Sequence, residues 1–330
     1  MRPLAWLRPD LFTLALVSTV GLATLLPVRG AAILWLTDAT QIAVALVFFL
    51  HGARLSRESV RRGLGHWRLH LAVLAASFAL MPLLGLLATR LPSGLLPPAL
   101  ASGVLFLCCL PSTMQAAVAF TSIAGGNVPA ALCGASLSNL IGVFATPLLV
   151  ALLMGAHGQI SAGSIEAIVL RILVPFAFGQ ALHPLIGPWL KRHALPLVVF
   201  DRGSILLVVY GAFSDAVETG LWPQLSPAGL AAMALVDLAL LGLVIGLTTL
   251  ASRAFGFSRE DEIAIVFCGS KKSLVAGIPM ANILFAGRGV GLLLLPLMLF
   301  HQIQLLACAM LARRYAERGV APAPAFEPAR

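Results

Sequence analysis

Two adjacent lysines inside a long apolar stretch are the residues whose chemistry fits least with their surroundings. Lys271 and Lys272 follow Gly269 and Ser270 and precede Ser273. An ammonium group donates hydrogen bonds and accepts none, and a charge at the centre of a bilayer costs at least about 2.5–3.5 kcal/mol. Neighbours on a helix point about 100° apart, so only one amine can face a given cavity. We expect one amine to fill a cation position and the other to face a substrate or a carboxylate. Structural pairing of both amines with backbone carbonyls is the alternative.

A second interrupted stretch lies earlier in the chain, at residues 108–115. It places Pro111 beside the polar side chains of Ser112, Thr113 and Gln115 in the middle of an apolar run. Proline removes a backbone donor and frees a carbonyl one turn earlier, and freed backbone at membrane depth is tolerated only where protein or a water-filled cavity receives it. The two interruptions lie about 160 residues apart, near half of the chain length. Interrupted spans in corresponding positions of two halves indicate the midplane binding site of a transporter.

Polar residues on and near these interruptions form the candidate site. The residues expected to contact a substrate during translocation are Ser112, Thr113, Gln115, Ser136, Ser138, Asn139, Ser270, Lys271, Lys272 and Ser273. Asp237, near the middle of its own apolar stretch, is the expected partner of a lysine, or else makes a helix–helix hydrogen bond without a role in transport. Hydroxyl groups in helices also commonly bond to their own backbone, which is the alternative for each serine and threonine.

The elements that must position these residues are membrane-spanning helices. Of the 330 residues, 59% are hydrophobic and 11% are charged, and the mean hydropathy is +0.97, whereas a soluble domain carries about 25% charged residues. This composition excludes a soluble enzyme with a single anchor. A span needs roughly 20 apolar residues, which predicts an all-α polytopic membrane protein of ten spans. These are residues 11–28, 34–53, 70–89, 97–123, 128–154, 164–183, 203–221, 228–251, 262–285 and 289–312.

The whole chain, residues 1–330, is interpreted as a single membrane domain with a polar, disordered tail at 319–330. The first apolar run follows Arg2 and Arg8, as in a signal peptide. Because further apolar runs follow it, we interpret it as an uncleaved first span.

The distribution of basic residues predicts how the chain is oriented. Sixteen lysines and arginines fall on the side of the two termini, and only Arg29, Arg90 and Arg288 fall in loops on the other side. Basic residues concentrate in cytoplasmic loops, so we expect a multi-pass inner-membrane protein with both termini cytoplasmic. The net charge of +9 then reflects orientation rather than nucleic-acid binding.

Other kinds of site are not expected. The five cysteines lie in apolar runs without C-x-x-C spacing, so we expect neither disulfides nor a metal site. No stretch places a nucleophile beside a base, so we expect neither an enzyme nor a cofactor. Glu166 and Arg171 are poorly spaced to pair on one helix, and Arg171 is expected to reach the membrane interface or to pair elsewhere.

Five short motifs carry a resemblance to a known family. They are Pro111–Gln115, Gly126–Val128, Ala135–Asn139, Asp201–Ser204 and Phe267–Ser273. On these motifs the chain resembles the bile acid:sodium symporter superfamily, within its sodium/bile acid cotransporter seven-like branch. The resemblance implies two inverted five-helix repeats, at 11–154 and 164–312, in which spans 1, 2, 6 and 7 form a panel against a core of the other six. It also implies that discontinuous spans 4 and 9 cross in the core, with the substrate between core and panel.

By this resemblance three positions should hold sodium ligands, and the sequence differs at each. Phe267 stands where sodium-coupled relatives have a glutamate, and Lys271 and Ser77 stand where they have glutamines. Sodium prefers oxygen ligands, and an ammonium offers none. We therefore expect weak sodium dependence, with Lys271, Asp237 and Ser77 as the ion-coupling residues. Lys271 either exchanges a proton in each cycle or keeps its charge, which leaves transport uncoupled or driven by the anion gradient.

Together these features predict a secondary transporter that moves a small organic anion by alternating access. The lysines and the N-terminal dipole of a half-helix would receive the anionic group. The alternative is a non-transporting membrane regulator or sensor that uses the same fold. The expected partners are the anion and the lipid bilayer, with the chain a monomer or a homodimer.

Overall fold

The computed structural model describes residues 11–54, 66–92, 96–154, 169–218, 220, 226–285 and 290–319. Every regular element in these residues is helical, which confirms the predicted all-α class for this part of the chain. In chain order the elements are α1 (Leu11–Leu25), α2 (Ala32–Arg54), α4 (Trp67–Ala75), the π-helix η2 (Ala76–Leu80), α5 (Met81–Ala88), α6 (Pro98–Cys108), α7 (Met114–Ile123), α8 (Val128–Met154), the π-helix η4 (Val169–Leu173), α10 (Val174–Arg192), α11 (Ala194–Glu218), α12 (Pro227–Ala254), α13 (Arg259–Ser270), α14 (Leu274–Leu284) and α15 (Val290–Gly319).

Eight helical stretches of the described chain are long and apolar enough to cross a membrane. One of them combines α4, η2 and α5, and another combines α13 and α14. Three shorter apolar helices, α1, α6 and α7, accompany them. The chain is therefore a polytopic membrane protein. Glu166 and the predicted tail at 320–330 lie outside the described residues.

The predicted end of the sixth span at residue 183 is wrong. Helix α10 continues through Pro184 and Pro188 to Arg192, and α11 begins two residues later at Ala194 instead of at residue 203. Membrane helices tolerate proline where neighbouring groups satisfy the freed backbone. In this region His183 Nδ1 also lies 2.7 Å from the carbonyl oxygen of Ala53 on α2, so the proline-containing turn is tied to its neighbour.

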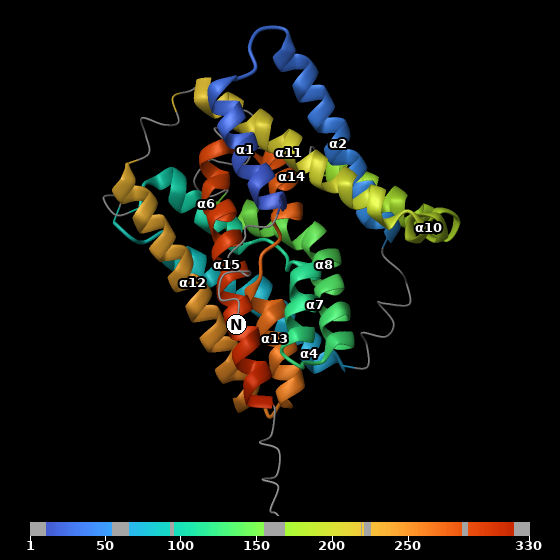
Figure 1. Cartoon of the computed structure of the whole chain (residues 1–330), viewed down its shortest axis with the longest axis vertical. Helices are drawn as coiled ribbons and strands as arrows, with labels where there is room; N and C mark the ends of the chain where they lie inside the picture. The colour runs from blue at the N-terminus through green and yellow to red at the C-terminus, as the bar shows by residue number, and fades with distance from the viewer. Residues whose placement is uncertain are drawn as a thin grey trace, which may run out of the picture.

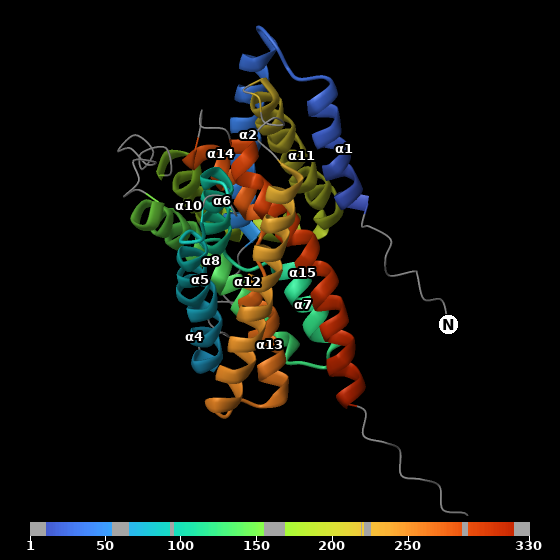
Figure 2. The same cartoon turned by 90° about the vertical axis from the view of Figure 1, so that its left-hand side faces the viewer.

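The helices form two groups (Figures 1 and 2). In the panel group, α10 and α11 pack against α2, and α1 packs against α11. In Figure 1 these blue and yellow helices lie across the upper part of the molecule. The core group contains α4 to α8 and α12 to α15, with α13 in contact with α4, α7, α8 and α12. The two groups meet mainly where α11 packs against α14 and α15.

Two glycines hold the panel group together by letting backbones touch. A Cβ added at Gly52 on α2 would lie 2.0 Å from the carbonyl oxygen of Phe176 on α10, and one added at Gly179 would lie 2.0 Å from that of Phe49 on α2. Small residues permit such close helix crossings in membranes. Any larger side chain at either position would separate α2 from α10.

Burial identifies the centre of the molecule. Within an apolar 18-residue window of the span formed by α13 and α14, 94% of the residues are buried, against 22–39% in the corresponding windows of the other seven spans. Those seven expose large apolar side chains, such as Leu238 and Leu250 on α12, whereas Asp237 on the same helix is fully buried. The α13–α14 span is therefore surrounded by protein while the others face lipid on one side.

Candidate functional site

The predicted interruption of the fourth span is present between α6 and α7, where residues 109–113 leave the helix. Pro111 has no N–H to continue the helical pattern. Each carbonyl from Cys108 to Ser112 nevertheless has a donor from another part of the chain. In chain order the donors are Lys272 Nζ, Thr146 Oγ1, Lys272 Nζ again, the Ser273 N–H and Asn139 Nδ2. Other parts of the protein thus satisfy the carbonyls of the interrupted backbone, as they must at membrane depth.

The predicted interruption of the ninth span is also present, between α13 and α14. Residues 271–273 are non-helical, and Lys271 and Ser273 have extended backbones. Successive side chains in an extended segment point to opposite sides. The helical spacing of about 100° expected for the two lysines is therefore wrong, and their amines enter different environments.

The two interrupted segments bond directly to each other where the spans cross. The Ser273 N–H donates to the Pro111 carbonyl at 2.9 Å, and Thr113 Oγ1 donates to the Lys272 carbonyl at 2.6 Å. The structure thus brings Thr113, Lys272 and Ser273 together at the crossing. Gln115, one residue into α7, is exposed and lies outside this contact.

The amine of Lys272 is enclosed by backbone oxygens. Its Nζ donates to the carbonyls of Ser77 at 2.9 Å, Cys108 at 2.9 Å and Leu110 at 2.8 Å. An ammonium group has three donors, so the side chain is saturated although it is fully buried. Of the two lysines, Lys272 is therefore the one that pairs with backbone carbonyls, which is the alternative expected for both.

The Ser77 carbonyl is available because of the π-helix η2. The N–H of Met81 bonds to the carbonyl of Ala76 instead of that of Ser77. A π-helical donor for Ser77 would come from residue 82, which is Pro82 and has no N–H. Lys272 therefore completes a helix whose own geometry leaves one carbonyl unpaired.

The amine of Lys271 lies in an aromatic environment. Its Nζ is 4.2 Å from the ring centre of Phe120 and 5.7 Å from that of Phe267, and the ring of Phe267 packs edge-on against Tyr315. No oxygen acceptor from the described residues reaches this amine, and the Cys308 thiol is close enough to interact with it. These residues do not fit a sodium ion, which prefers several oxygen ligands.

Asp237 does not pair with either lysine in the structure. Its side chain is fully buried on α12, and neither carboxylate oxygen has a hydrogen-bond partner among the described residues. The expected ion pair fails for a physical reason: Lys272 is already saturated by carbonyls, and Lys271 points into the aromatic cluster. The alternative expectation, a helix–helix hydrogen bond from Asp237, is also absent from this part of the chain.

The span that comes after each interrupted span in the chain supports the interruption with an amide side chain. Asn139 on α8 donates to the Ser112 carbonyl at 2.9 Å, and Ser138 accepts from the Ser112 N–H at 3.1 Å. On α15, Gln304 accepts from the Lys272 N–H at 2.9 Å and donates to the Lys272 carbonyl at 3.0 Å. Sequence reasoning missed Gln304, although its place on the span after the interruption matches that of Asn139.

Two of the predicted serines bond to their own helices. Ser136 Oγ donates to the Leu132 carbonyl at 2.7 Å, and Ser270 Oγ donates to the Val266 carbonyl at 2.6 Å. This is the alternative role that hydroxyls commonly take in membrane helices. Their contact with a substrate stays a prediction.

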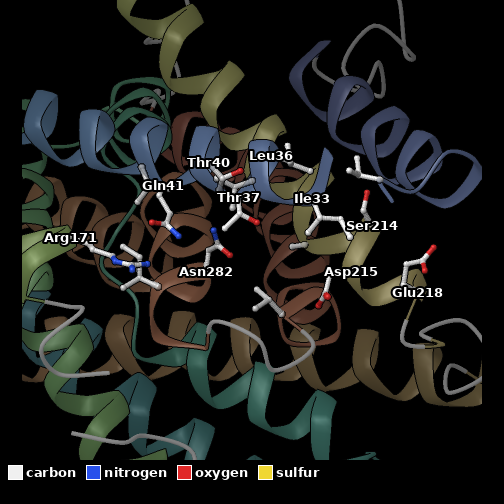
Figure 3. Close-up of a pocket in the computed structure, with 17 residues that line it drawn as sticks. Ile33, Leu36, Thr37, Thr40, Gln41, Arg171, Ser214, Asp215, Glu218 and Asn282 are labelled. Atoms are coloured by element: carbon white, nitrogen blue, oxygen red, sulfur yellow. The ribbon is translucent and has the colours of Figure 1, made fainter. Parts of the chain in front are cut away.

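A cavity of about 350 Å³ lies between the panel group and α14. Its polar lining comes from α2, η4, α11 and α14, as Figure 3 shows, and none of the ten predicted substrate residues lines it. The polar residues on its wall are Thr37, Thr40, Gln41, Arg171, Ser214, Asp215, Glu218 and Asn282. Sequence reasoning missed them because they are scattered over four elements, and only Arg171, an arginine inside an apolar run, gave a signal.

Two interrupted helices cross inside the buried core, and a polar cavity lies at the boundary with the second helix group. This arrangement is typical of membrane transporters. The chain belongs to the SBF-like CPA transporter family, whose family model matches residues 10–317. This confirms the superfamily resemblance drawn from the five motifs.

Relatives of known name cover nearly the whole chain. PA2026, an uncharacterized protein of Pseudomonas aeruginosa, is 54% identical over 312 residues, which are 94% of each chain. YfeH of Escherichia coli (strain K12), named as a candidate symporter, is 50% identical over 309 residues, or 93% of this chain and 92% of YfeH. Sodium/bile acid cotransporter 7 of Rattus norvegicus is 29% identical over 321 residues, which are 94% of each chain.

Proposed function

We propose that this protein is a secondary transporter that moves a small organic anion by alternating access without using sodium. The observation that carries the proposal is the cavity between the panel group and the second half of an interrupted span, α14. Family membership supports transport, and the name of YfeH supports a symport mechanism. The protein is proposed to be no enzyme, because its polar groups are arranged for binding and for supporting broken helices.

Alternating access requires two rigid bodies that move against each other, and the two helix groups are suited to this role. The panel group and the core group meet mainly through α11 against α14 and α15. We propose that the eight long spans, together with α1 and with α6 joined to α7, make ten crossings in two inverted halves. Rocking of one group would open the cavity to one side and then to the other.

Sodium independence is supported by the two lysines. The Lys272 ammonium donates to three carbonyls that would otherwise be free to bind a cation. Phe267 and Lys271 stand at two positions where the resemblance implies sodium ligands, and neither side chain offers an oxygen atom. Lys271, which lacks an oxygen acceptor among the described residues, is the proposed proton carrier. If it keeps its charge throughout, transport is uncoupled or driven by the anion gradient.

Uptake into proteoliposomes tests the proposal. Purified protein would be assayed with a panel of labelled organic anions, in sodium and in choline buffers at fixed pH, with and without an imposed pH gradient. We expect saturable uptake of at least one anion at equal rates in sodium and choline. Strict sodium dependence would contradict sodium independence, and saturable binding without uptake would favour a regulator or sensor.

The proposed orientation, with both termini on the cytoplasmic side of the inner membrane, has its own test. Reporter fusions after Gly94 and after Arg318 should report opposite sides of the membrane, because sixteen basic residues fall on one side and three on the other. Reports from the same side for both fusions would overturn the assignment.

A further inference from the structure

The cavity between the panel group and α14 holds several polar side chains that have no partner. Among the described residues, no hydrogen bond or ion pair engages Arg171, Gln41 or Asn282, and these three line one end of the cavity together (Figure 3). We infer that Arg171, Gln41 and Asn282 form a carboxylate-binding subsite and that the substrate is a small hydroxylated monocarboxylate. This inference rests on the proposed transport function.

Arg171 is suited to be the anion anchor. It lies in the π-helix η4, an irregularity that frequently marks functional sites, and its side chain is exposed into the cavity. A charge inside a membrane span that faces lipid would be costly, so the cavity is the environment that tolerates it. The planar guanidinium presents paired donors that match a carboxylate, and the amides of Gln41 and Asn282 add further donors beside it.

Two hydroxyl groups on the cavity wall lack partners in the described chain: Thr40, near Gln41, and Ser214, near Asp215 (Figure 3). Thr40 is 4% exposed and Ser214 is 3% exposed, and neither hydroxyl oxygen has a hydrogen-bond partner in the described chain. A buried polar group without a partner is unfavourable. Each hydroxyl can donate and accept, so hydroxyl groups along a substrate chain would satisfy Thr40 and Ser214 together.

The opposite end of the cavity is acidic. Asp215 and Glu218 lie there, far from Arg171 in Figure 3, and Glu218 forms an ion pair with Arg29 at 2.7 Å. Carboxylates at this end accept hydrogen bonds from hydroxyls and repel a second anionic group, so a dicarboxylate is disfavoured. A phosphate dianion would also find only one unpaired arginine.

The dimensions favour a chain of about six carbons. The cavity follows α2 from Ile33 to Gln41, a rise of about 12 Å for eight helical residues. Its volume of about 350 Å³ is at the lower end of the range of small-molecule pockets. An extended six-carbon acid with hydroxyls along its length fits both the size and the order of polar groups.

Equilibrium binding to the purified full-length protein tests the inference with four probes that share a six-carbon chain. Gluconate has one carboxylate and hydroxyls, glucarate has two carboxylates, sorbitol has none, and hexanoate has no hydroxyls. We expect gluconate to bind at least about tenfold more tightly than the other three, since one charge-assisted hydrogen bond is worth a factor of about ten or more.

Variants of the arginine locate the subsite. Arg171→Gln should weaken gluconate binding about 10–100-fold, Arg171→Lys should restore part of it, and both should unfold at the same temperature as the unaltered protein. Arg90→Gln removes an exposed arginine outside the cavity and should leave binding unchanged. Equal binding of gluconate by the unaltered protein and Arg171→Gln would overturn the inference, and so would tighter binding of glucarate or hexanoate.

Parallel uptake measurements separate the inference from the proposed function. If gluconate binds through Arg171 but is not taken up, the subsite stands and the transport proposal fails. If another anion is taken up at a rate that Arg171→Gln leaves unchanged, transport stands and the subsite fails.

Discussion

The crossing of the two interrupted spans pairs its freed backbone carbonyls, whereas the cavity beside α14 leaves side-chain hydroxyls without partners in the described chain. At the crossing each carbonyl from Cys108 to Ser112 has a donor. In the cavity the hydroxyls of Thr40 and Ser214 have no partner in the described chain. Satisfied polar groups hold a fold, whereas unsatisfied groups facing a cavity are available to a ligand. This difference suggests that the crossing supports the interrupted helices and that the cavity is the part suited to bind a ligand.

The two lysines repeat this contrast over a distance of one residue. Lys272 donates three hydrogen bonds to backbone carbonyls, while Lys271 contacts aromatic rings and no oxygen acceptor among the described residues. The extended backbone at residue 271 sends the two side chains to opposite sides. Lys272 therefore supports the fold, and Lys271 is the amine that we propose as the proton carrier.

The largest expected effect follows the loss of the Lys272 amine. Lys272→Met keeps most of the length of the side chain but leaves the carbonyls of Ser77, Cys108 and Leu110 without a donor. An unpaired buried acceptor costs about 1–3 kcal/mol, so for three acceptors we expect about 3–9 kcal/mol of destabilisation or failure to fold. The measurement is thermal unfolding in detergent, followed by yield from membranes.

The control for this change is the neighbouring position. Lys271→Met removes an equally buried lysine that lacks an oxygen acceptor, so it should change stability by less than about 1 kcal/mol. Equal losses for Lys271→Met and Lys272→Met would show that the two amines do not differ in the way described.

A smaller effect is expected for the amide that supports the ninth-span interruption. Gln304→Leu removes both bonds to the Lys272 backbone and should destabilise the protein by about 2–4 kcal/mol. Gln41→Leu makes the same substitution in the cavity, where the amide has no partner among the described residues, and should be close to neutral. Chemical unfolding of the two variants side by side checks the difference, and a larger loss for Gln41→Leu would invert the comparison.

Loss of the Lys271 amine should affect the coupling of transport to protons more than it affects folding. Lys271→Gln removes a charge without unpairing any oxygen, so we expect the variant to fold with nearly unchanged stability and to lose the response of uptake to a pH gradient. Uptake by variant and unaltered protein, each with and without the gradient, measures this. An unchanged response to the gradient would exclude Lys271 as the proton carrier.

Much of the crossing could be predicted from the sequence because its signals are local. Pro111 and the adjacent lysines interrupt apolar runs that are otherwise unbroken, and both interruptions occur where the sequence places them. The hydrogen-bond partners of these residues were harder to predict from the sequence. The role of Ser77 depends on a π-helix and a proline that together free its carbonyl. Asp237 was expected to pair with a lysine, but carbonyls hold the amine of Lys272 and that of Lys271 lies against aromatic rings.

The cavity could hardly be predicted, because its lining shares no local pattern. Gln41, Arg171 and Asn282 lie more than 100 residues from one another in the chain, and only packing of the panel group against α14 brings them together. Likewise, no periodicity shows that α10 continues past Pro184, because the stabilising contacts come from α2. Local sequence patterns predict where helices are interrupted, but they do not predict how the helices pack against one another.

The smallest expected effect in stability gives the sharpest test, because the same substitution should act with opposite signs in the two regions. Thr40 and Thr146 are both buried, with exposures of 4% and 0%. Thr146 Oγ1 donates to the Cys109 carbonyl at 2.8 Å at the crossing, whereas the Thr40 hydroxyl in the cavity has no partner in the described chain. Valine has nearly the shape of threonine, so Thr146→Val should cost about 1–2 kcal/mol by unpairing a carbonyl. Thr40→Val should leave stability unchanged or raise it by up to about 1 kcal/mol while weakening gluconate binding. Thermal unfolding of both variants without ligand, followed by gluconate titration, measures these effects. A loss of stability in Thr40→Val as large as that in Thr146→Val would mean that the cavity is built to support the fold in the same way as the crossing.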